Sequence, residues 1–225
     1  PASVQPGDVL LLAGTFNSST TTVGNPAGWT RVAGGASTGA GMQSYLWTRT
    51  AAAGDAGTVV RVTTSSYAKT SLQVAAYANS SGVLSQGFTF STTTSASRTT
   101  PLVNAATSGS GLVSIWADKG SASSWTVPAA ATLRNQTTGS PSGQITSALA
   151  DSTQVGPGTV GGLTATANAT GTKAVTWSIL LAREVPPMGG DTLFSSMSAA
   201  FDALSEGMKA TLRSLNAVHS SRHVF

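Results

Sequence analysis

The hydrophobic and polar positions along this chain follow two different patterns, and the change falls at Pro186 and Pro187. Before it, short apolar runs alternate with turn-forming residues, as is typical of β-strands. After it, from Asp191 onward, apolar residues recur every three or four positions, which predicts an α-helix. The pattern predicts a β domain over residues 1–185, a linker over 186–190, a helix over 191–219 and a tail over 220–225.

The β domain contains eight strand-like runs, separated by segments rich in Gly, Asn, Asp and Pro. The runs are residues 8–13, 42–48, 58–63, 72–77, 111–116, 145–149, 160–167 and 174–181. No stretch before residue 186 keeps a helical period. We therefore predict a mainly β fold, an antiparallel β-sandwich resembling a jelly roll, with Thr and Ser at solvent-facing strand positions.

Five tryptophans divide into two groups by their surroundings. Trp47, Trp116 and Trp177 lie inside apolar runs and are predicted to be buried. Trp29 and Trp125 lie beside turns, where burial at the ends of the sandwich is the favoured interpretation. The alternative is that Trp29, Trp125 or Tyr67 is exposed and stacks on a ligand such as a sugar ring.

The predicted helix has a continuous apolar seam with the three- and four-residue spacing of a heptad repeat. The seam positions are Phe194, Met197, Phe201, Leu204, Met208, Thr211, Leu215 and Val218. Small uncharged residues, including Ala200, Gly207 and Ser214, flank the seam and would allow several helices to approach closely. We predict self-association as a homotrimer, against the alternatives of a helix folded onto its own domain or docked on another protein.

The composition excludes several classes of function. Only 9% of the 225 residues are charged and the net charge is +4, with basic residues scattered singly, so a nucleic-acid partner is not expected. No run approaches the roughly 18 apolar residues of a membrane span. The chain has no cysteine, which excludes disulfides and thiolate chemistry. A surface of Ser, Thr, Asn and Gln suits burial in a large assembly.

No residues with catalytic spacing stand out, and we predict neither a catalytic site nor a cofactor. The two histidines, His219 and His223, lie at the end of the predicted helix, where a solvated end is favoured over a metal site. Asp8 and Asp55 adjoin turn glycines, and Asp118-Lys119-Gly120 also indicates a turn. No pair of carboxylates is placed as glycoside hydrolysis requires.

Three motifs in the first half resemble a known module. They are Gly7-Asp8-Val9-Leu10-Leu11, Pro26-Ala27-Gly28-Trp29-Thr30 and Ala53-Gly54-Asp55. In this order and spacing they resemble a β-sandwich module of minor tail and tail-fibre-like proteins of phages that infect actinobacteria. The resemblance covers residues 1–183. A further strand usually precedes this module in that family, so a beginning missing from this chain is expected.

The resemblance implies a non-enzymatic structural protein of the virion, in a tail fibre or tail tip. It supplies no catalytic residues. The apolar seam adds the expectation that the protein assembles through its C-terminal helix. The partners expected on this basis are further copies of the chain, other virion proteins and a host-surface glycan. A capsid decoration protein and a carbohydrate-binding or adhesin module remain the alternatives.

Overall fold

The structure, a computed structural model, describes residues 1–106, 109–138, 144–183, 205–207 and 209. The chain divides into two units, Pro1–Val185 and Pro186–Phe225. The described part of the first unit, called the body below, forms fourteen strands, and all their pairings are antiparallel. The prediction of a mainly β, antiparallel fold is confirmed.

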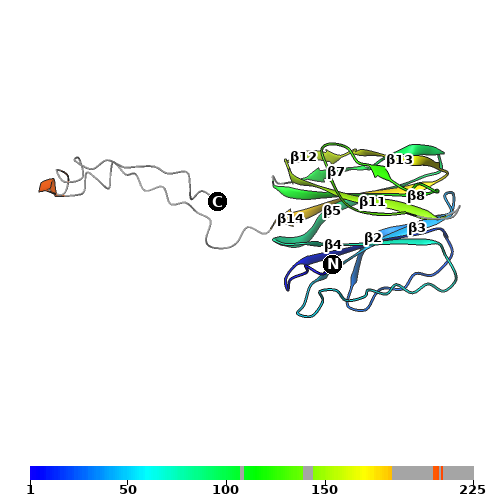
Figure 1. The fold of residues 1–225 in the computed structure, drawn as a ribbon, viewed down its shortest axis with the longest axis horizontal. Coiled ribbons are helices and arrows are strands. Elements are labelled where there is room, and N and C mark those ends of the chain that lie inside the picture. The colour runs from blue at the N-terminus through cyan, green and yellow to red at the C-terminus, as the bar shows by residue number, and fades with distance from the viewer. Residues whose placement is uncertain (107–108, 139–143, 184–204, 208, 210–225) are drawn as a thin grey trace. The chain divides into compact units, whose positions relative to one another are not determined.

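Two large sheets form the centre of the body (Figure 1). The four-stranded sheet has the order β2 (Thr30–Ser37), β3 (Met42–Thr50), β1 (Val9–Phe16) and β4 (Thr70–Tyr77). The five-stranded sheet has the order β10 (Thr132–Thr137), β11 (Ile145–Val155), β8 (Ser110–Lys119), β14 (Ala174–Arg183) and β5 (Ser80–Ser91).

Two small sheets complete the strand inventory of the body. One contains β6 (Ser95–Thr99), β13 (Thr164–Gly171) and β9 (Trp125–Thr126), and the other contains β12 (Gly158–Gly161) and β7 (Leu102–Ala105). Figure 1 shows these strands beside the five-stranded sheet, on the side away from the four-stranded sheet. The five-stranded sheet is therefore covered on both faces.

The central core lies between the two large sheets, because alternate residues of their strands point toward one another. Leu11 of β1 and Leu46 of β3 contribute from one sheet, and Ile115 of β8 and Trp177 of β14 contribute from the other. The Trp177 ring stacks on Phe88 with centroids 4.5 Å apart, and its Nε1 donates to Ser44 Oγ at 2.9 Å. Trp177 thus packs on the neighbouring strand β5 of its own sheet and is hydrogen-bonded to β3 of the facing sheet.

The intervening residues of the same strands build further apolar clusters on the outer faces. Leu10 and Leu12 join Trp47 on the outer face of the four-stranded sheet, and Trp116 packs with Trp125 on the outer face of the five-stranded sheet. Consequently every residue of β1 is buried. Burial on both faces explains why the sequence of this strand is a continuous apolar run rather than an alternating one. Trp47, Trp116 and Trp177 are fully buried, as predicted.

The expectation that Thr and Ser mark solvent-facing strand positions is wrong for the central strands. Thr176 and Ser178 of β14 are buried, and their hydroxyls donate to the backbone oxygens of Thr99 and Pro101 at 2.9 and 2.7 Å. These hydroxyls tie the five-stranded sheet to the segment that covers it. A small hydroxyl with a partner can be buried at little cost.

The predicted strand over residues 58–63 is also wrong. These residues pair with no strand, although Val60 and Val62 pack against the cluster around Trp47. A single antiparallel bridge joins Val23 to Thr64 nearby. The alternating pattern here arises because one side of the segment packs on the sheet, although its backbone pairs with no strand. The sequence alone does not distinguish such a segment from a paired strand.

The second unit contributes only Ser205, Glu206, Gly207 and Lys209 to the description. The amide of Lys209 donates to the Ser205 carbonyl at 2.9 Å, and its Nζ lies 2.8 Å from Glu206 Oε1. The rest of the predicted helix over 191–219, with all eight seam residues, lies outside the described residues. No helix in the described part of the chain is long and apolar enough to cross a membrane.

Candidate functional site

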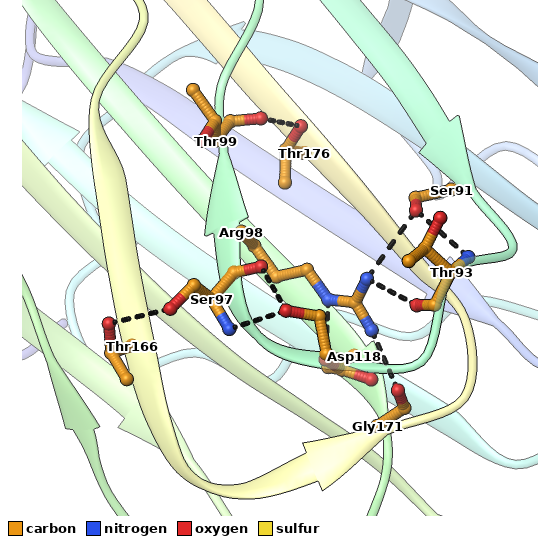
Figure 2. Close-up of polar contacts among 10 residues, drawn as sticks. Ser91, Thr93, Ser97, Arg98, Thr99, Asp118, Thr166, Gly171 and Thr176 are labelled. Carbon is orange, nitrogen blue, oxygen red and sulfur yellow. Dashed lines mark hydrogen bonds and ion pairs between the residues drawn. The ribbon is translucent and has the colours of Figure 1, made fainter.

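The most unusual polar feature of the body is a buried ion pair between Arg98 of β6 and Asp118 of β8 (Figure 2). Arg98 Nε donates to Asp118 Oδ2 at 2.7 Å, and the two side chains are 3% and 1% exposed. A buried charge needs a partner of opposite charge, and Arg98 and Asp118 are each other's partner.

Arg98 also joins two segments that are distant in sequence. Its Nη1 donates to the carbonyl of Thr93 at 2.8 Å and lies 3.4 Å from Ser91 Oγ, while Nη2 donates to the carbonyl of Gly171 at 2.9 Å. Figure 2 shows the guanidinium between these groups. The side chain thus links the residues that follow β5, the end of β8 and the end of β13.

The second oxygen of Asp118, Oδ1, is buried without a hydrogen-bond partner in the described structure. It lies against Gly171, where an added Cβ would overlap it, so glycine is required at this position. Burial raises the pKa of Asp118 above its usual value, while the hydrogen bond and charge of Arg98 lower it. The net shift is upward because the loss of hydration is the larger effect.

A buried carboxyl group with a raised pKa is a candidate general acid or base, so its surroundings decide its role. The cavity next to Arg98 has a volume of about 230 Å³. Besides Arg98 and Ala174, its lining consists of hydroxyl residues: Thr89, Ser91, Thr93, Ser95, Ser97, Thr99 and Thr176. Asp118 does not line it, and no second titratable group does. The arrangement therefore fits a structural link between strands better than acid–base chemistry.

The other carboxylates of the described body also accept hydrogen bonds from arginines or backbone amides of the fold. Asp8 accepts from the Gln5 amide at 2.9 Å, and Asp55 binds Arg49 at 2.9 Å and the Ala52 amide at 2.7 Å. Asp151 accepts from Arg134 Nε at 2.9 Å through both oxygens. The prediction that Asp8 and Asp55 serve turns agrees with these contacts. The prediction of a turn at Asp118 is wrong, because Asp118 lies within β8 and binds Arg98.

The three motifs of the first half meet at one place. The Gly7 amide donates to the Ala51 carbonyl at 2.9 Å, beside the Arg49–Asp55 pair. A cavity of about 130 Å³ lies here, and Trp29, Arg49 and Asp55 line it together with apolar residues of β1 and β4. The motifs are thus parts of a single packing unit over the outer face of the four-stranded sheet.

The predicted ligand-stacking residues differ sharply in exposure. Trp29 and Trp125 are 7% and 5% exposed, and each belongs to an apolar cluster, so neither offers a ring face to a ligand. Tyr67 is 86% exposed. Of the three aromatic candidates, the structure leaves Tyr67 alone in position to stack.

Comparison with protein-family models gives a partial match. The family model of the taurine catabolism dioxygenase TauD, TfdA family, matches residues 135–225, which is less than half of the chain. No solved structure matches the chain. The match begins within β10 and includes β11 and β14, whose sheet partners β8 and β5 lie before it. The matched segment therefore divides the five-stranded sheet and is not a separate unit of the fold.

A dioxygenase with non-haem Fe(II) holds the metal with two histidines and one carboxylate. In the described part of the chain, no group of three or more His, Cys, Asp or Glu side chains could hold a metal ion. Within the match, Asp151 is already bonded to Arg134, and His219 and His223 lie outside the described residues. The described residues do not fit an iron site.

Proposed function

We propose that the body is a non-catalytic structural module of a phage virion, placed in the tail or tail tip. One observation carries this proposal: all four carboxylates of the described body bind backbone amides or arginines within the fold. Carboxylates used in this way hold turns and strands and are not positioned for a substrate. The assignment to a phage virion rests on the resemblance of the three sequence motifs to tail modules.

Analysis of purified particles of the encoding phage tests the proposal. Mass spectrometry should detect the chain in intact virions, and gold-labelled antibodies against the body should mark the tail in electron micrographs. Absence of the chain from the particles would contradict the proposal. Labelling over the capsid shell would instead favour a decoration protein.

Assembly through the helix over residues 191–219 is part of the proposal. Truncating a large buried apolar side chain costs about 3–5 kcal/mol, and in a homotrimer the loss recurs in each copy. The double substitution Phe201→Ala and Leu204→Ala should therefore convert the trimer to a monomer while the β circular dichroism signal persists. Light scattering on the full chain measures this, and a monomeric wild type at tens of micromolar would refute self-association.

The partial family match motivates a second candidate function, an Fe(II)-dependent dioxygenase. Anaerobic titration of the full chain with Fe(II) separates it from the structural role. Stoichiometric binding that is lost in both His219→Ala and His223→Ala would support the dioxygenase. We expect no such binding.

A further inference from the structure

A polar groove lies at the end of the body where β4 and β11 begin. Its volume is about 360 Å³, and its lining is Tyr67, Ala68, Lys69, Thr70, Gln144 and Ile145. One wall belongs to the segment entering the four-stranded sheet and the other to the segment entering the five-stranded sheet. The groove is larger than the cavities beside Trp29 and Arg98 and falls within the ~300–1,000 Å³ range of small-molecule sites.

The backbone on both sides of Tyr67 is anchored. Before it, the Ser66 amide and hydroxyl bond Thr21 Oγ1 at 3.2 and 3.0 Å. After it, the Lys69 carbonyl accepts from the Asn17 amide at 2.8 Å. An exposed aromatic ring on a fixed segment can bind a ligand with little loss of backbone freedom.

The groove combines a stacking surface with hydrogen-bonding groups. The Tyr67 ring offers an apolar face, and the Gln144 carboxamide carries both a donor and an acceptor. The hydroxyl of Thr70 donates to the Ala68 carbonyl at 2.9 Å, which leaves its oxygen lone pairs to accept a bond. A sugar ring has the matching surfaces, because its C–H groups form an apolar face and its rim carries hydroxyls.

We propose that this groove is a glycan-binding site in which one sugar ring stacks on Tyr67 and its hydroxyls bond Gln144 and Thr70. The proposal deepens the proposed function. The assignment of the glycan to the host surface rests on the virion role, whereas the binding site itself does not. The lining has a single cationic residue, which favours a glycan over the phosphate backbone of a nucleic acid.

An array of defined neutral and acidic oligosaccharides, probed with the full chain, provides the first measurement. Calorimetric titration with the best oligosaccharide on the array then compares the wild type with three variants. Tyr67→Ala should weaken binding about tenfold or more, because the stacking surface is removed. Tyr67→Phe should retain binding within about threefold. Gln144→Ala should fall between them.

Val59→Ala is the matched control, because Val59 is 77% exposed and does not line the groove. It should bind as the wild type does. Circular dichroism of each variant should retain the β signal. No binding to any oligosaccharide, or equal binding by wild type and Tyr67→Ala, would overturn the site. That outcome would leave the virion localisation measurement unaffected, so the two proposals fail separately.

Discussion

Two arginine–aspartate pairs in the body have nearly the same geometry and very different surroundings. Arg98 and Asp118 approach within 2.7 Å, and Arg49 and Asp55 within 2.9 Å. The first pair is 3% and 1% exposed, whereas the second is 30% and 14% exposed. The comparison teaches that contact distance does not set the energetic role of an ion pair. Its burial sets that role, because a buried charge that loses its partner cannot be hydrated instead.

The largest expected effect comes from removing one acid of each pair. Asp118→Ala should lower the free energy of unfolding by about 3–5 kcal/mol, since Arg98 would remain charged and buried. Asp55→Ala should cost about 1 kcal/mol or less, because water can reach Arg49. Urea unfolding followed by circular dichroism gives both values. Equal losses would show that burial does not govern these pairs.

A double substitution sharpens the same comparison. Replacing both charges, by Arg98→Met together with Asp118→Leu, should recover most of the stability lost in Asp118→Ala, because no unpaired charge remains. The hydrogen bonds from Arg98 to the Thr93 and Gly171 carbonyls would still be lost. A double variant as unstable as the single one would assign the loss to those bonds.

The contrast between the pairs also marks the limit of what sequence reasoning could predict. The continuous apolar runs of β1, β8 and β14 were found because burial on both faces leaves a strong signal. The edge strand β2 was missed, since it is rich in Gly and Ala and none of its residues is fully buried. Arg98 and Asp118 are separated by 20 residues and meet only through the packing of β6 near β8, so no local sequence pattern predicts their contact.

The candidate glycan groove could be predicted from the sequence in part. Tyr67 was predicted as one of three candidate stacking residues, because an aromatic residue in a polar segment is a visible signal. Its partner Gln144 was not predicted, since the groove forms only when segments of the two large sheets meet at one end of the body. Burial of Trp29 and Trp125 was the favoured interpretation, but they are buried in clusters over the outer faces of the sheets, whereas the sequence pattern suggested the ends of the sandwich.

The glycine beside the buried pair gives the next largest effect. A Cβ at Gly171 would overlap Asp118 Oδ1, so Gly171→Ala should destabilise the body by about 1–3 kcal/mol. Gly156→Ala is the control, because no atom lies within 4 Å of its added Cβ. That variant should be neutral or stabilised by up to about 1 kcal/mol. Thermal unfolding of both proteins at neutral pH measures the difference.

The raised pKa of Asp118 predicts a particular dependence of stability on pH. A carboxyl whose folded-state pKa exceeds its unfolded value stabilises the fold below that unfolded value, near 3.8. This contribution is lost as the pH rises through the folded-state pKa. Asp118→Asn removes the titration, so the free energy of unfolding of the wild type minus that of the variant should fall as the pH rises through that window. A difference that rises with pH would mean that Arg98 outweighs burial and that the pKa is depressed.

The smallest effect concerns Tyr77, which lies near the third pair, Arg134 and Asp151. The Tyr77 hydroxyl is buried without a hydrogen-bond partner, and burial together with the charge of Asp151 raises its pKa. A group with a raised folded-state pKa contributes stability below its unfolded value, here 10.0, and loses it as the pH rises further. Tyr77→Phe should therefore match the wild type at pH 7 or exceed it slightly, and should lose less stability above pH 10. Urea unfolding at pH 7 and at about pH 10.5 tests this, because equal losses in the two proteins would mean that Tyr77 ionises in the folded body as easily as in the unfolded chain.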